Sequence, residues 1–169
     1  DLLYESACYK LSISFFYLFK IIKHLFAGKA NLKARLAEGF EFDPALLPFR
    51  QPIVDFVERR RNAGAHTVLI SASNQQLVSK IGEFLGCFDE AFGSDDKINL
   101  KGLKKANFLV DKYGVNGFDY IGDSIADIPV WKEADKVLIA GASKRVIKKV
   151  SDIFSYYECI DEPLNSKIS

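Results

Sequence analysis

Two aspartates stand at the end of a short apolar run near residue 120. Asp123 falls where the run in FDYIGD stops, and Asp127 follows four residues later in GDSIAD, on the first turn of a predicted helix. Two like charges about 4 Å apart repel by about 1 kcal/mol in water and about 4 kcal/mol at an effective dielectric of 20. A hard cation with oxygen ligands, Mg²⁺ above all, would offset that repulsion. Alternatively, Asp123 or Ser124 caps the helix and Asp127 is a first-turn acid that the helix dipole favours.

A second polar segment follows the apolar run of residues 66–71, in VLISASNQQ. The hydroxyl of Ser71 and the free amides near Ser73 and Asn74 suit a phosphate oxygen at a helix N-terminus. Serine and asparagine also cap helices routinely. Taken alone, this segment favours capping over phosphate binding.

A third candidate is Lys101 in NLKGLKKA, at the start of a helix predicted over residues 101–113. A lysine at this end of a helix opposes the helix dipole. Its placement suggests a role such as neutralising an anionic substrate, although an isolated lysine is more often simply solvated. Lys104 and Lys105 are predicted to be solvated.

Helices and strands alternate after residue 52. Strands are predicted at 66–71, near 90–92, in FDYIGD and in KVLIA, and helices at 52–61, 74–85, 101–113, 125–134 and 143–150. This alternation predicts an α/β fold, a Rossmann-like parallel sheet with helices on both faces. Ligands of such sheets bind beyond the carboxyl ends of the strands, which is where Ser71 and Asp123 fall.

The front of the chain has a different pattern. Residues 4–27 are rich in aromatics and predict a helix, a shorter helix is predicted at 31–38, and FDPALLPFRQP has the composition of a linker. We therefore expect a helical cap at 1–47, an α/β core at 48–152 and a tail at 153–169. The apolar stretch from Leu11 to Phe26 is too short to span a membrane, which takes about 20 apolar residues.

The composition is that of an ordinary globular domain, with 49% hydrophobic and 27% charged residues. The net charge of +1 and the lack of a basic run longer than Arg59–Arg61 argue against nucleic-acid binding. Three widely spaced cysteines without metal-type spacing indicate a reduced, cytosolic setting.

The order of a strand-end serine, a helix-opening lysine and GDxxxD resembles the second, third and fourth motifs of the haloacid dehalogenase-like superfamily. The resemblance implies that Ser71 binds phosphate, that Lys101 (or its rival Lys105) is the motif lysine, and that Asp123 is the Mg²⁺ ligand, supported by Asp127. It implies a phosphohydrolase acting on a small phosphorylated substrate or a lipid-linked phosphate. The front helices resemble the cap of one branch of the superfamily.

The stretch from LGCFDEAF to VWKEAD, with DLLYESACY and LPFRQPIVDFV, resembles more narrowly the soluble domain that precedes a UbiA-type prenyltransferase in bacterial membrane proteins. This implies a fused C-terminal membrane domain and a place at the cytoplasmic face of the inner membrane. It also opens an alternative function, a non-catalytic regulatory or docking module of the prenyltransferase. A receiver-like signalling domain is a third and weaker hypothesis.

The first motif of the superfamily, a strand followed by DxDGT, has no counterpart in this sequence. The chain opens with DLLYES and contains no DxD triplet. We therefore expect the first core strand and its nucleophile to be absent, encoded upstream of Asp1 or donated by a partner, and we expect no phosphatase activity from this polypeptide alone.

Overall fold

The computed structural model describes residues 10–14, 43–47 and 49–160. Its strands are β1 (Lys10–Ser14), β2 (His66–Asn74), β3 (Glu90–Ser94), β4 (Asp119–Gly122), β5 (Val137–Ile139) and β6 (Glu158–Cys159). Its α-helices are α3 (Gln51–Asn62), α4 (Gln75–Leu85), α5 (Leu103–Tyr113), α6 (Ile128–Trp131) and α7 (Lys144–Ile153). Two single 3₁₀ turns, η1 (Pro44–Leu46) and η2 (Ile125–Asp127), complete the described elements.

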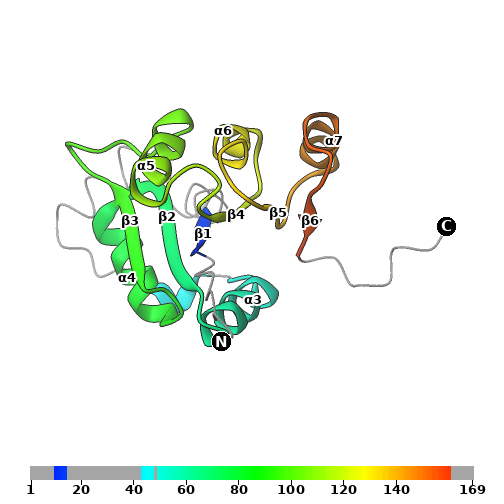
Figure 1. Ribbon diagram of the computed structural model, residues 1–169. Helices are drawn as coiled ribbons and strands as arrows, with labels where there is room; N and C mark the ends of the chain where they lie inside the picture. The colour runs from blue at the N-terminus through cyan, green and yellow to red at the C-terminus, as the bar shows by residue number, and fades with distance from the viewer. Residues whose placement is uncertain (1–9, 15–42, 48, 161–169) are drawn as a thin grey trace, which may run out of the picture.

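The strands form one parallel sheet in the order β3-β2-β1-β4-β5-β6 (Figure 1). The strand order reverses direction between β1 and β4, and the crevice beyond such a switch point is where open α/β sheets bind ligands. Receiver domains have the different order 2-1-3-4-5. The receiver-like hypothesis is therefore wrong for this chain.

The central strand β1 corrects two expectations. Residues 10–14, predicted as part of a helix over 4–27, pair with β2 on one side and β4 on the other. A first core strand is therefore present, in the place where it was expected to be missing. Without β1, the strands β2 and β4 would each have a row of backbone groups without hydrogen-bond partners. The hydrogen bonds that β1 forms with both strands therefore outweigh the helical pattern of its sequence. The rest of the expected cap, residues 1–9 and 15–42 with its helix at 31–38, lies outside the described residues.

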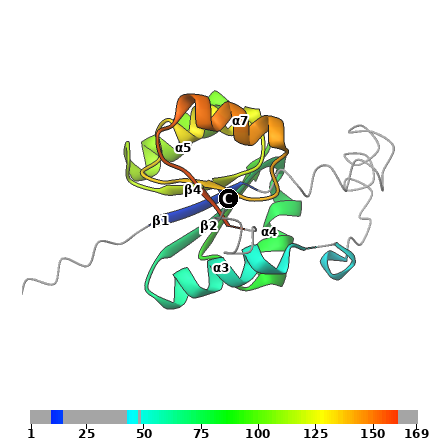
Figure 2. The same ribbon diagram turned by 90° about the vertical axis from the view of Figure 1, so that its right-hand side faces the viewer.

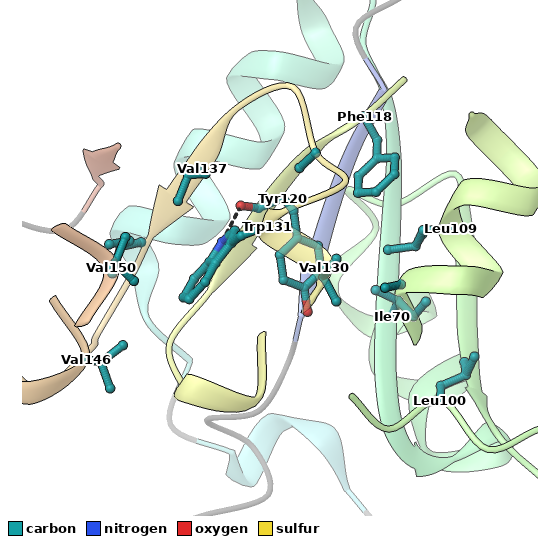
Figure 3. Close-up of a cluster of buried hydrophobic side chains, with 13 residues drawn as sticks. Ile70, Leu100, Leu109, Phe118, Tyr120, Val130, Trp131, Val137, Val146 and Val150 are labelled. Atoms are coloured by element: carbon teal, nitrogen blue, oxygen red, sulfur yellow. Dashed lines mark hydrogen bonds between the residues drawn. The ribbon is translucent and has the colours of Figure 1, made fainter. Parts of the chain in front are cut away.

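Side chains of the central strands alternate between two cores, as expected for a parallel sheet buried on both faces. Ile70 and Tyr120 face α5, α6 and α7, whereas Leu69 and Ile121 face the side of α4 and α3. Figure 2 shows α5 and α7 above the sheet and α3 and α4 below it. On the first side, Trp131 packs between Tyr120 and strand β5, with only 1% of its surface exposed (Figure 3).

The sheet extends further toward the C-terminus than the sequence indicates. Helix α7 runs to Ile153, and Glu158 and Cys159 pair with Leu138 and Ile139 of β5. Part of the stretch expected to be a patternless tail therefore belongs to the sheet. Within the described residues, no helix is both long and apolar enough to cross a bilayer.

Cys87 packs under α3 and is only 2% exposed. Burial, with the carboxylate of Glu58 as a lesser cause, raises its pKa to about 11. At pH 8 about one thiol in a thousand is then ionised, and only the thiolate reacts. We expect the Cys87 peptide to stay unmodified when the native protein is treated with iodoacetamide, and to be modified fully in urea. Equal labelling in both conditions, measured by mass spectrometry, would contradict this burial.

Candidate functional site

Ser71, near the end of β2, and Asp123, directly after β4, lie level with each other toward the carboxyl edge of the sheet. Leu69 and Ile121 both pair with Ile13 of β1, so Ser71 and Asp123 each stand two residues beyond that shared level. Adjacent strands lie about 4.8 Å apart, which places these two backbone positions about 10 Å from each other. Ser71 and Asp123 therefore lie on the two sides of β1, close to the switch point of the sheet.

Asp127 is a buried carboxylate whose two oxygens are engaged inside the protein. It is 1% exposed. Its Oδ2 accepts from the amides of Asp123 and Ser124, at 3.2 and 3.1 Å, and from the Ser124 hydroxyl at 3.0 Å. Its Oδ1 accepts from the Tyr120 hydroxyl at 2.8 Å. Because a carboxylate offers about four lone-pair positions, these four donors occupy Asp127, which holds the turn after β4.

Lys105 is the lysine that the structure brings to the acids. It is 2% exposed, and its Nζ lies 3.0 Å from the Tyr120 hydroxyl and 3.7 Å from Asp127 Oδ1. Burial lowers the pKa of Lys105, and the carboxylates of Asp127 and Asp123 oppose that shift. The expectation that Lys105 is solvated is therefore wrong. It shares the inner face of α5 with the buried Ala106 and Leu109.

Lys101, the first candidate for the motif lysine, lies just before the start of α5. The helix begins at Leu103 rather than at Lys101, and the Lys101 side chain is exposed. The Lys101 side chain is exposed to solvent, whereas the Lys105 amino group is buried beside Asp127. A role for Lys101 toward a substrate stays a prediction.

The last residues of β2, which runs three residues further than the predicted strand at 66–71, combine a buried hydroxyl with a helix cap. Ser71 is 6% exposed, and its Oγ accepts from the Ser73 amide at 3.1 Å. Asn74 Oδ1 accepts from the Gln76 amide at 2.8 Å and caps α4. Capping thus accounts for Asn74, and the Ser73 amide is engaged. Ser71 can still donate its hydroxyl hydrogen, so it is the best placed of the three expected phosphate ligands.

Gly122 allows the turn and the core to approach each other closely. A Cβ at this position would lie 2.8 Å from the Trp131 ring and 2.9 Å from Asp127. Overpacking of this kind costs about 1–3 kcal/mol, so we expect Gly122→Ala to lower the free energy of urea unfolding by that amount. Gly82→Ala is a matched control, since its nearest neighbour is Ala91 Cβ at 3.1 Å and alanine favours its helix. Equal losses in the two variants would contradict the close approach at Gly122.

A second polar cluster lies at the opposite, amino edge of the sheet, around Glu90. Its Oε1 is 2.6 Å from His66 Nε2 and accepts from the Tyr113 hydroxyl at 3.1 Å, while Oε2 is 2.9 Å from Lys112 Nζ. Burial alone would raise the pKa of Glu90, but hydrogen bonds from Lys112, His66 and Tyr113 lower it below its ordinary value. Its partners lie at the strand starts and at the end of α5, so this cluster is separate from the site.

The lowered pKa of Glu90 predicts a pH dependence of stability. A carboxyl group with a lowered folded-state pKa contributes stability above its ordinary pKa of 4.5, and that stability is lost as the pH falls through the folded-state value. We expect the free energy of urea unfolding to fall as the pH drops below about 4.5, and to fall less steeply in Glu90→Gln. Identical slopes for the two proteins would rule out this contribution.

The family model for haloacid dehalogenase-like hydrolases matches residues 10–132. The chain belongs to the haloacid dehalogenase-like hydrolase family. It is 35% identical, over 135 residues, to the uncharacterized protein y4nM of Sinorhizobium fredii; the match covers 80% of this chain and 26% of that protein. This haloacid dehalogenase-like chain thus spans about a quarter of the relative's length.

Two solved structures share the fold of this haloacid dehalogenase-like chain. A protein of unknown function from Bordetella pertussis Tohama I superimposes with a TM-score of 0.61 at 13% identity, covering 90% of this chain and 98% of that one. A substrate-bound phosphoserine phosphatase superimposes with a TM-score of 0.59 at 20% identity, covering 91% and 93%. The predicted Rossmann-like fold of parallel strands and flanking helices is confirmed.

Tyr120 is the site residue that the sequence did not single out. It lies three residues before Asp123 in FDYIGD, where an apolar strand residue was expected. Its ring is buried like that of a core residue, but its hydroxyl joins Lys105 to Asp127. A polar-tipped aromatic within an apolar strand is a usable signal, because a buried tyrosine hydroxyl normally has a partner.

Proposed function

We propose that this chain forms the phosphate- and metal-binding part of a Mg²⁺-dependent phosphohydrolase site. The observation that carries the proposal is the level placement of Ser71 and Asp123 on the two sides of β1, at the switch point of the sheet. Asp123 would be the metal ligand, Asp127 its support, and Ser71 the donor to a phosphate oxygen. Membership of the hydrolase family supports the same assignment.

The residues present fit a partly hydrated Mg²⁺ better than a metal held by protein alone. Across residues 10–14, 43–47 and 49–160, no group of three or more His, Cys, Asp or Glu side chains gathers to hold an ion. Mg²⁺ commonly uses one or two carboxylates, several waters and a substrate phosphate, so Asp123 is a sufficient protein anchor. Bound there, the ion would neutralise negative charge on a phosphoryl group.

The substrate class follows from the same edge of the sheet. A serine hydroxyl and the exposed ammonium of Lys101 offer donors to a phosphate monoester. We infer a small phosphorylated molecule or a lipid-linked phosphate as the substrate of the complete site. The chain contains no DxD triplet, so the proposal assigns it binding and orientation of phosphate rather than nucleophilic attack.

Manganese binding tests the metal assignment, since Mn²⁺ replaces Mg²⁺ and is observed directly by electron paramagnetic resonance. We expect Asp123→Asn to weaken Mn²⁺ binding at least about tenfold, because it removes the charged ligand. Asp111→Asn, which removes an exposed carboxylate from α5, should leave the affinity unchanged. Equal affinities for the wild type and Asp123→Asn would exclude a metal site at Asp123.

A second candidate, a non-catalytic regulatory or docking module beside a membrane prenyltransferase, draws support from one observation. The chain matches only 26% of the length of its relative from Sinorhizobium fredii, which leaves room for further domains in a protein of that kind. Under this proposal the protein acts at the cytoplasmic face of the inner membrane through a fused membrane domain. Long apolar spans encoded beyond Ser169 would support it, and their absence from the full reading frame would exclude it.

A further inference from the structure

Tyr120 does more than fill the core. Its side chain is fully buried, and its ring meets Trp131 nearly edge-on, with centroids 6.4 Å apart and an interplanar angle of 75°. Trp131 Nε1 also donates to the Tyr120 carbonyl at 3.2 Å (Figure 3). A phenylalanine would supply the same packing. Packing therefore does not explain the hydroxyl. Because burying a polar group without a hydrogen-bond partner is costly, the partners of this hydroxyl must account for it.

The hydroxyl lies between a cation and an anion. It accepts from Lys105 Nζ at 3.0 Å and donates to Asp127 Oδ1 at 2.8 Å. Lys105 and Asp127 themselves are 3.7 Å apart, which exceeds the 2.7–2.9 Å typical of a direct charge-assisted hydrogen bond. The ion pair is thus bridged by Tyr120.

Asp127 connects the Tyr120 hydroxyl to the turn that carries Asp123, the proposed metal ligand. The other oxygen of Asp127 accepts the amides of Asp123 and Ser124. A carboxylate bonded on one side alone can rotate about its terminal torsion, whereas contacts on both oxygens fix its plane. Through Asp127, the Tyr120 hydroxyl therefore restrains the backbone at Asp123.

We propose that Tyr120 is a positioning residue of the site: its hydroxyl couples Lys105 to Asp127 and so holds the Asp123 turn in the geometry that receives a divalent cation. Only the effect on metal affinity rests on the proposed function; the restraint of the Asp123 turn does not. Residues bonded directly to a metal ligand typically change metal affinity by 10–100-fold when mutated. Because Tyr120 acts on Asp123 through Asp127, we expect the lower end of that range.

The test compares Tyr120→Phe with Tyr113→Phe in the 169-residue chain. Each variant removes one hydroxyl, and Tyr113 donates to Glu90 at the opposite edge of the sheet. By NMR, we expect the Asp123 and Ser124 amides to exchange with solvent about five- to tenfold faster in Tyr120→Phe, the factor that one hydrogen bond provides. Both amides should exchange at the wild-type rate in Tyr113→Phe. We also expect Mn²⁺ affinity to fall about tenfold in Tyr120→Phe alone.

The two measurements separate the possible failures. Unchanged exchange of both amides in Tyr120→Phe would overturn the positioning role. Faster exchange with unchanged Mn²⁺ affinity would reduce Tyr120 to a stabilising residue and also overturn it. If Asp123→Asn binds Mn²⁺ as the wild type does, the metal assignment fails, and amide exchange alone then decides whether Tyr120 restrains the turn. Should Tyr120→Phe not fold, Lys105→Met is measured instead. It removes the donor that orients the Tyr120 hydroxyl but leaves the bond from that hydroxyl to Asp127, so both amides should exchange faster than in the wild type by a smaller factor. Wild-type exchange rates in Lys105→Met would overturn the coupling.

Discussion

The 169-residue chain should release no phosphate from p-nitrophenyl phosphate in the presence of Mg²⁺. Hydrolysis of phosphate monoesters is so slow that enzymes accelerate it by up to about 10²¹-fold, and covalent catalysis requires a nucleophile. The sequence has no DxD triplet, and between Ser14 and Asp43 its only acids are Glu38 and Glu41. Binding of phosphate at Ser71 and of a cation at Asp123 would therefore persist without turnover.

The assay is decisive when it includes Asp123→Asn, purified in the same way. Phosphate release at the same rate from both proteins indicates a contaminating phosphatase. Release by the wild type that Asp123→Asn abolishes would contradict the prediction, and would require a nucleophile other than a DxD aspartate.

Asp127→Ala should be among the most damaging single substitutions in the protein. It removes the carboxylate opposite the buried Lys105 and the acceptor of three further donors in the turn. Breaking a buried ion pair by removing one partner costs about 3–5 kcal/mol. We expect the free energy of urea unfolding to fall by that amount.

Lys105→Met is the informative partner variant. It removes the buried cation and keeps much of the side-chain length, while Asp127 retains its donors from Tyr120, Asp123 and Ser124. Its cost should therefore be clearly smaller than that of Asp127→Ala. A Lys105→Met protein as unstable as Asp127→Ala would show that the lysine, rather than the turn, is the main partner of the carboxylate.

Elements with continuous apolar runs were predictable from the sequence. The strand at 66–71 and the strand before Asp123 are buried on both faces, and such strands carry their own signal. Their parallel arrangement puts Ser71 and Asp123 at one edge without further information. The segment KLSIS alternates polar and apolar residues, which is a strand pattern, but it is only five residues long and runs into the aromatic stretch that predicted a helix. Its strand state depends on two partners more than fifty residues away.

The choice between the lysines was not predictable for a different reason. A charged residue can be buried at position 105 only because Tyr120 and Asp127 lie beside its ammonium group. Sequence spacing places Lys105 on the face of α5 that also carries Leu109, but it cannot supply the tertiary partners that make burial tolerable. The helix-start argument for Lys101 assumed that α5 begins two residues earlier than it does.

The pairing of β1 also bears on how the molecule assembles during synthesis. The strand leaves the ribosome before the other described strands, yet it is the one that joins β2 and β3 to β4, β5 and β6. Its second neighbour is residues 119–121, so the middle of the sheet cannot close until more than a hundred further residues have been synthesised. Such long-range pairing slows folding, and until β4 arrives a growing chain exposes one unpaired strand edge to its neighbours.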